Sequence, residues 1–131
     1  MKRHLTQMQS QKTEKLHHQY TDVTLRILHY DFAGPIPVSD WGPPMAKAIY
    51  ILLARSRDRF IIIYADDCED TNKIDYLTGN PLFGKWVRAA GGERNLYICA
   101  LALPNSDAAR RARIVSKIVA TYKPVCNTDD P

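Results

Sequence analysis

Four carboxylates follow directly after the apolar run Phe60–Ala65: Asp66, Asp67, Glu69 and Asp70. Carboxylate oxygens are hard ligands of the kind that Mg²⁺ and Mn²⁺ prefer, and the ends of strands often carry chemistry. Asp66 and Asp67 are therefore candidate metal ligands. The same residues suit a solvated turn whose aspartates accept hydrogen bonds from backbone amides, and we favour this second interpretation.

Basic side chains are the second feature that could do chemistry, because each can contact a phosphate with a salt-dependent attraction. The candidates fall into three groups along the chain: Arg55, Arg57 and Arg59; Lys85 and Arg88; and Arg110, Arg113 and Lys117. The formal net charge of +4 permits a nucleic-acid partner without requiring one. A solvated basic face remains the alternative interpretation.

Cysteine and histidine usage excludes several classes of site. Cys68, Cys99 and Cys126 are widely spaced and form no CxxC pair, which argues against a structural zinc site. Free thiols are typical of a reducing cytosol, so we expect a cytoplasmic protein. All four histidines precede residue 30, and none lies at a spacing from a cysteine that is typical of a Cys-His catalytic pair, so a cysteine hydrolase is not expected. The apolar runs Ala48–Ala54 and Phe60–Ala65 are too short to span a membrane, and no membrane partner is expected.

The chain divides into two parts. Residues 1–44 read as an irregular N-terminal extension that begins with a flexible polar arm and ends in a Pro-rich loop. Within it, the alternation of Val23, Leu25 and Ile27 favours one short strand. Residues 45–128 read as the compact domain.

The elements of that domain follow from its apolar periodicity. Two apolar runs joined by the charged link 55–59 predict an antiparallel hairpin that ends abruptly at Asp66. A helix starting at Asn80 ends at Gly91-Gly92, the run Leu96–Leu103 predicts a third strand, and a helix capped by Ser106 continues to Tyr122. We therefore expect an α/β (α+β) fold with a small three-stranded antiparallel sheet flanked by helices.

Three short sequence patterns give the domain a family resemblance. Ala48-Ile49-Tyr50 and Tyr64-Ala65-Asp66 stand where two tripeptides would lie on neighbouring strands, and Tyr122-Lys123-Pro124-Val125-Cys126-Asn127 follows the last helix. Together with the element order, these patterns resemble the GIY-YIG domain over residues 45–127.

The resemblance implies a shallow site in which Tyr50 and Tyr64 orient the attacking water in DNA cleavage, with Asn127 tying the chain end to the sheet. The arginine that steadies the phosphate in that family has no clear counterpart here, and Lys73 is the basic residue nearest its position. The glutamate that holds a divalent metal falls at Val115 or Ser116, neither of which suits Mg²⁺.

The leading hypothesis is a nucleic-acid-binding GIY-YIG-like module, with DNA rather than RNA as its partner and weak or absent nuclease activity. In it, the Tyr50/Tyr64 surface and the basic face of the last helix make the contacts. One alternative is an endonuclease with a rearranged site, in which Asp66 or Asp67 holds Mg²⁺ or Mn²⁺ and Tyr50, Tyr64 and Lys73 act in catalysis. The other is a protein-interaction or assembly module, including a homodimer.

Overall fold

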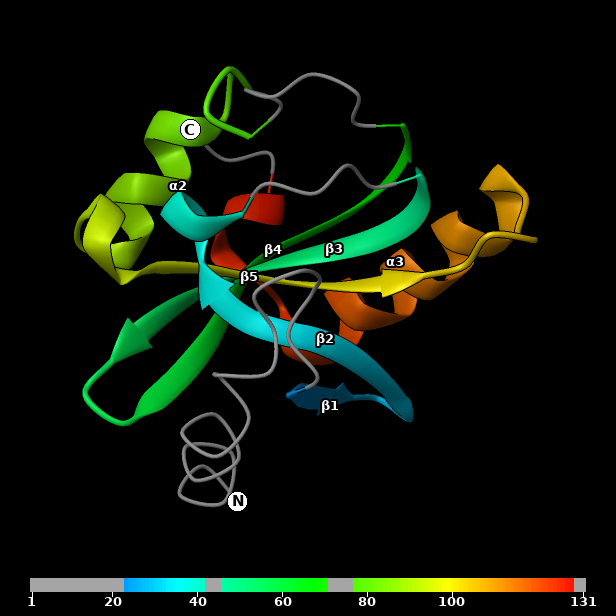
Figure 1. Ribbon diagram of the computed structural model, residues 1–131, viewed down its shortest axis with the longest axis horizontal. Helices are drawn as coiled ribbons and strands as arrows, with labels where there is room; N and C mark the ends of the chain where they lie inside the picture. The colour runs from blue at the N-terminus through cyan, green and yellow to red at the C-terminus, as the bar shows by residue number, and fades with distance from the viewer. Residues whose placement is uncertain (1–22, 42–45, 71–76, 129–131) are drawn as a thin grey trace.

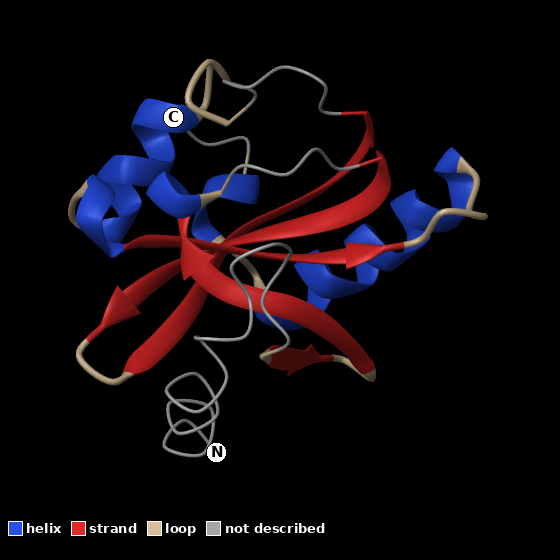
Figure 2. Cartoon of the chain, in the orientation of Figure 1, coloured by secondary structure: helices blue, strands red, loops and turns tan. Residues whose placement is uncertain are grey.

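Five strands and two helices account for most of the chain that the structure describes (Figures 1 and 2). The computed structural model describes residues 23–41, 46–70 and 77–128, apart from the side chain of Asp70. The strands are β1 (Thr24–Ile27), β2 (Tyr30–Pro37), β3 (Ala46–Ser56), β4 (Arg59–Asp70) and β5 (Leu96–Ala102). The helices are α2 (Phe83–Ala90) and α3 (Ala108–Tyr122), and a short 3-10 helix, η4 (Val125–Asn127), follows α3.

The strands form one antiparallel sheet in the order β1-β2-β5-β3-β4. The expected mixed α+β class with an antiparallel sheet and flanking helices is confirmed, but the expectation of three strands is wrong. The two additional strands, β1 and β2, lie in the segment that the sequence suggested was largely irregular. The short strand predicted around Val23–Ile27 is present as β1.

The Gly-Pro-rich sequence of β2 is accommodated by an irregularity in its pairing with β5. The register shifts between Ala33 and Ile36, so Gly34 and Pro35 lie in the interruption. A Cβ on Gly34 would come within 2.8 Å of the carbonyl oxygen of Ile98, and its φ of +113° disfavours other residues. Gly34 and Pro35, which predict a loop from sequence, are therefore accommodated inside this strand.

The sheet separates the core into two layers, and the interior strand β3 contributes to both because its side chains alternate between the two faces. Tyr50 and Leu52 face the side covered by α2 and its Trp86. Ile49, Ile51 and Leu53 face the side covered by α3. Figure 1 shows the two helices on opposite sides of the sheet. Among the described residues, no helix is long and apolar enough to cross a membrane.

The acidic segment belongs to β4 rather than to a turn. Asp66, Asp67 and Asp70 pair with Tyr50, Ile49 and Ala46 of β3, so the expectation that the strand ends before Asp66 is wrong. One extra residue of β4, Ile63, is accommodated by a bulge opposite Leu52 and Leu53. Asp66 and Asp67 are therefore held on a strand, and their side chains point to opposite faces of the sheet.

Candidate functional site

Tyr50 and Tyr64 lie on the neighbouring strands β3 and β4, with both side chains on the α2 side of the sheet. Tyr50 pairs with Asp66, and Tyr64 pairs with Leu52, so the two phenols are diagonal neighbours. Their ring centroids are 6.2 Å apart, and the Tyr64 ring lies 5.0 Å from that of Trp86. The two rings therefore come together, as the sequence suggested.

These phenols belong to the core rather than to an open patch. Tyr50 is 1% exposed and Tyr64 is 8% exposed. The expectation that they face a shallow open site is wrong, because α2 packs Trp86 over this side of the sheet. A catalytic role for Tyr50 and Tyr64 stays a prediction.

Asp66 is the carboxylate that lies beside these tyrosines. The Tyr64 hydroxyl donates a 2.9 Å hydrogen bond to Asp66 Oδ2, and the backbone N–H of Asp67 donates a 2.8 Å bond to Asp66 Oδ1. Burial raises the pKa of Asp66 above its usual range, and these two hydrogen bonds offset part of the increase. Desolvation therefore outweighs the stabilisation of the ionised carboxylate.

The other weak metal candidate, Asp67, faces the opposite side of the sheet. Its Oδ2 accepts a 3.2 Å hydrogen bond from Nε of Arg111 on α3. Since Asp66 lies on the α2 side and Asp67 on the α3 side, the two do not share one ligand position. No cluster of three or more metal-ligating His, Cys, Asp or Glu side chains occurs within residues 23–41, 46–70 and 77–128.

The raised pKa of Asp66 predicts a pH dependence of stability. A carboxyl group whose pKa is higher in the folded state stabilises the fold most below its unfolded value of 3.8, and this contribution is lost as pH rises through the folded pKa. Wild type should therefore lose stability relative to Asp66→Asn between pH 4 and pH 7. Urea unfolding of both proteins at the two pH values measures this, with Asp58→Asn in the exposed β3–β4 turn as the charge-matched control. A difference between wild type and Asp66→Asn that is independent of pH would contradict the prediction.

The structure shows the expected attachment of the chain end to the sheet through hydrogen bonds of the Asn127 side chain. Its side-chain oxygen accepts a 2.8 Å hydrogen bond from Ala65 N, and its side-chain nitrogen donates a 2.9 Å bond to Ala65 O. Because β4 is an edge strand, these two bonds satisfy backbone groups that no other strand pairs. The other expected site residue, Lys73, lies outside the described residues.

The basic candidates do not form one surface. Arg57 lies in the two-residue turn between β3 and β4, whereas Arg55 donates to the hydroxyl of Tyr97 at 3.3 Å and stacks beside that ring. The remaining candidates are on other elements: Arg59 begins β4, Lys85 and Arg88 are on α2, and Arg110, Arg113 and Lys117 are on α3. The tyrosines lie on the α2 side of the sheet and the basic face of the last helix lies on the α3 side, so the two do not form one surface. That both contact nucleic acid stays a prediction.

A groove of about 810 Å³ brings the α3 cations together with an aromatic wall. Arg110, Arg113 and Lys117 line one side of this groove. The other side is lined by Leu28 and His29 of the β1–β2 turn and by Tyr30, the first residue of β2. The two walls are joined where Leu28 N donates a 3.3 Å hydrogen bond to the hydroxyl of Tyr122, the last residue of α3. We refer to this feature as the α3 groove.

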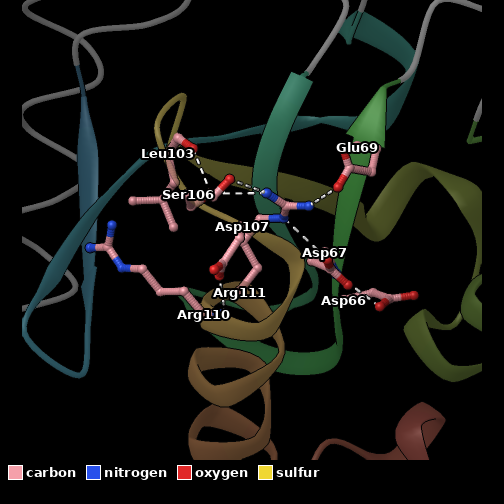
Figure 3. A network of polar contacts seen from close by, with 8 residues as sticks. All are labelled: Asp66, Asp67, Glu69, Leu103, Ser106, Asp107, Arg110 and Arg111. Atoms are coloured by element: carbon pink, nitrogen blue, oxygen red, sulfur yellow. Dashed lines mark hydrogen bonds and ion pairs between the residues drawn. The ribbon is translucent and has the colours of Figure 1, made fainter.

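Sequence reasoning missed Arg111, the most buried charged residue described (Figure 3). Its guanidinium donates to Asp67 at 3.2 Å, to the carbonyl oxygen and hydroxyl of Ser106 at 3.0 and 2.9 Å, and to Glu69. The helical spacing could have predicted that Arg111 is buried, because it lies three and seven residues before Ile114 and Ile118 and therefore on the same apolar face of the helix. A charge on the apolar stripe predicts a buried ion pair.

A second difference concerns the start of α3. Asp107 caps the helix by accepting a 2.8 Å hydrogen bond from Arg110 N, whereas the expected cap, Ser106, instead bonds Leu103 O and Arg111. Figure 3 shows Arg110 extending away from the buried Arg111, toward the side on which β1 and β2 lie. Neighbouring arginines therefore have different positions, one in the core and one in the groove.

The chain was also compared with protein-family models, curated proteins and solved structures, and none of the three comparisons finds a match.

Proposed function

We propose that this protein binds nucleic acid through the α3 groove and has weak or no nuclease activity. The observation that carries the proposal is the wall of exposed cations formed by Arg110, Arg113 and Lys117. They are spaced at positions i, i+3 and i+7 and so share one helical face. Three cations that line one groove can contact successive phosphates, and each contact adds a salt-dependent attraction.

The GIY-YIG-like character of residues 45–128 is part of the same proposal. It is supported by the hairpin that carries Tyr50 and Tyr64 on one face, by the helix, strand and helix that follow, and by the bonds of Asn127 to Ala65. Burial of the two phenols favours binding over cleavage, because water and a phosphodiester must reach a catalytic hydroxyl.

The triple variant Arg110→Ala, Arg113→Ala, Lys117→Ala tests the proposal. At about 50 mM salt its affinity for DNA or RNA oligonucleotides should fall at least about 10-fold, and the slope of log K against log salt should shrink by about 2 if the ligand is single-stranded. Fluorescence anisotropy with labelled oligonucleotides measures both quantities.

The matched control removes three exposed cations that lie on other elements: Arg57→Ala, Arg59→Ala, Arg88→Ala. Because both variants change the net charge equally, a general electrostatic attraction would weaken both alike. Equal losses would contradict the assignment to the α3 groove. Failure of the wild type to bind duplex, branched or single-stranded DNA, or RNA, at low salt would overturn the proposed function.

A metal-dependent endonuclease is the second candidate, and the hydrogen bond between Tyr64 and Asp66 is the observation that favours it. Asp66 also lies directly across from Tyr50, so a carboxylate stands beside both phenols. A plasmid-nicking assay with Mg²⁺ or Mn²⁺ separates the candidates. Nicking that Tyr50→Phe and Asp66→Asn both abolish would establish the enzyme.

A further inference from the structure

We propose that the α3 groove is specific for single-stranded nucleic acid, with an unpaired base stacked on the His29/Tyr30 wall and the backbone held by the cations of α3. This inference rests on the proposed function, because it assumes that the groove is the nucleic-acid site. It adds the class of ligand, which the cationic wall alone does not define.

The two walls of the groove differ in chemistry. One carries the cations Arg110, Arg113 and Lys117. The other carries the rings of His29 and Tyr30, whose centroids are 4.3 Å apart with an interplanar angle of 31°. A row of cations beside an aromatic platform is the combination that proteins use to bind single strands, because every base has a π-face and every nucleotide a phosphate.

Base pairing decides between a single strand and a duplex. In a duplex the bases are stacked between their neighbours, so a groove that contacts the backbone reaches phosphates but not free base faces. The aromatic wall would then add little to binding. In a single strand the bases can turn away from the backbone, so one strand can satisfy both walls at once.

The size of the groove fits a short stretch of strand. The axial distance from Arg110 to Lys117 is about 10 Å at about 1.5 Å per helical residue. This is the axial length of about three nucleotides of a stacked strand at about 3.4 Å each, and of fewer nucleotides in an extended strand. The cations of α3 can therefore contact only a few successive phosphates.

The walls are also linked to each other before any ligand arrives. Leu28 has a φ of +58° in the β1–β2 turn, and its N–H donates to the hydroxyl of Tyr122 at the end of α3. Ile27 of β1 packs in the same core cluster as Ile114 and Ile118 of α3. A site formed in advance loses less conformational entropy when it binds.

Two carboxylates near the groove are engaged with other groups. Asp31, next to Tyr30, forms a 3.0 Å ion pair with Arg26, which offsets its charge. Asp107 accepts a hydrogen bond from the backbone of Arg110 as the helix cap. Among the residues that the structure describes, no acidic one lines the groove itself, so an anionic ligand there meets the cationic side chains of α3.

The test uses three fluorescein-labelled probes of equal length with the full chain: a dT₁₂ strand, an abasic 12-mer with the same number of phosphates, and a 12-base-pair duplex. We expect dT₁₂ to bind at least about 10-fold more tightly than the abasic strand. Each base that stacks on an aromatic side chain adds favourable binding free energy, and the abasic strand has no bases to stack. The duplex should bind more weakly than dT₁₂ at equal salt.

The variant His29→Ala isolates the stacking contribution, since His29 is exposed in a turn and its truncation leaves the core intact. It should lower the affinity for dT₁₂ about threefold or more and change the affinity for the abasic strand less than about twofold. Tyr30→Leu should act in the same direction, with its melting temperature measured as the folding control. Arg110→Ala, Arg113→Ala should weaken the binding of both strands.

The outcomes separate the two proposals. Equal affinity for dT₁₂ and the abasic strand, or a His29→Ala variant that binds dT₁₂ as wild type does, would overturn the single-strand inference while nucleic-acid binding stands. No binding of any of the three probes would overturn the single-strand inference, and if branched DNA and RNA also fail to bind at low salt, both proposals are overturned. Binding to phosphatidylserine vesicles with no binding to any of these nucleic acids would also overturn both.

Discussion

Replacing Arg111 by methionine is expected to lower the melting temperature by about 5–15 °C. Methionine retains much of the buried volume but none of the donors, so buried Ser106 loses the two hydrogen bonds that it accepts from the guanidinium. Asp67 and Glu69 lose their cation at the end of β4. Arg111→Lys should have an intermediate effect, because one ammonium cannot reproduce the fork of donors.

The neighbouring position provides the control for this prediction. Arg110 is exposed, and we expect Arg110→Met to shift the melting temperature by less than about 2 °C. Differential scanning calorimetry of the three variants measures the comparison. An Arg111→Met protein as stable as wild type would show that the hydrogen bonds and ion pairs of the buried guanidinium contribute nothing net to stability.

The network of Arg111 also bears on the proposed site. It joins β4 to the turn that precedes α3, and α3 carries the cationic wall of the groove. Arg111 itself lies in the core and does not line the groove. Its effect on binding would therefore act through the position of α3, and variants at Arg111 are best compared with groove variants only after their stability has been measured.

Local sequence predicted the elements whose signals are local. The β3–β4 hairpin, α2 and α3 follow from apolar periodicity and from stop signals such as Gly91, which adopts φ +80° at the end of α2. The strand β2 was missed because Gly34, Pro35 and Pro37 predict a loop. Its pairing with β5 depends on contacts with residues about sixty positions away, which no local pattern encodes.

The candidate site was predictable in part for the same reason. The spacing of Arg110, Arg113 and Lys117 places them on one helical face, and they do line one groove. The facing wall, His29 and Tyr30, could not be found, because the turn and α3 meet only through tertiary packing between residues such as Leu28 and Tyr122. Burial of Tyr50 was equally hidden, since it depends on where α2 packs.

Tyr50→Ala provides the second large effect, and it separates a core tyrosine from a surface catalytic one. Because the Tyr50 side chain is 1% exposed beside Tyr64, truncation should lower the free energy of unfolding by about 3–5 kcal/mol. A tyrosine on an open site would change it by less than about 1 kcal/mol. Urea unfolding measures the difference, with Ile61→Ala, at a residue that is 51% exposed on β4, as the strand control.

The milder variant Tyr50→Phe links stability to function, since it keeps the ring and removes only the hydroxyl. If the α3 groove is the binding site, Tyr50→Phe should leave oligonucleotide affinity unchanged within about twofold, because Tyr50 lies on the opposite side of the sheet from α3. If Tyr50→Ala were as stable as wild type, the result would contradict the burial of Tyr50 in the core and indicate that its side chain lies on an open surface. A tenfold loss of oligonucleotide affinity in Tyr50→Phe would contradict the α3 groove as the binding site and place the site on the α2 side of the sheet.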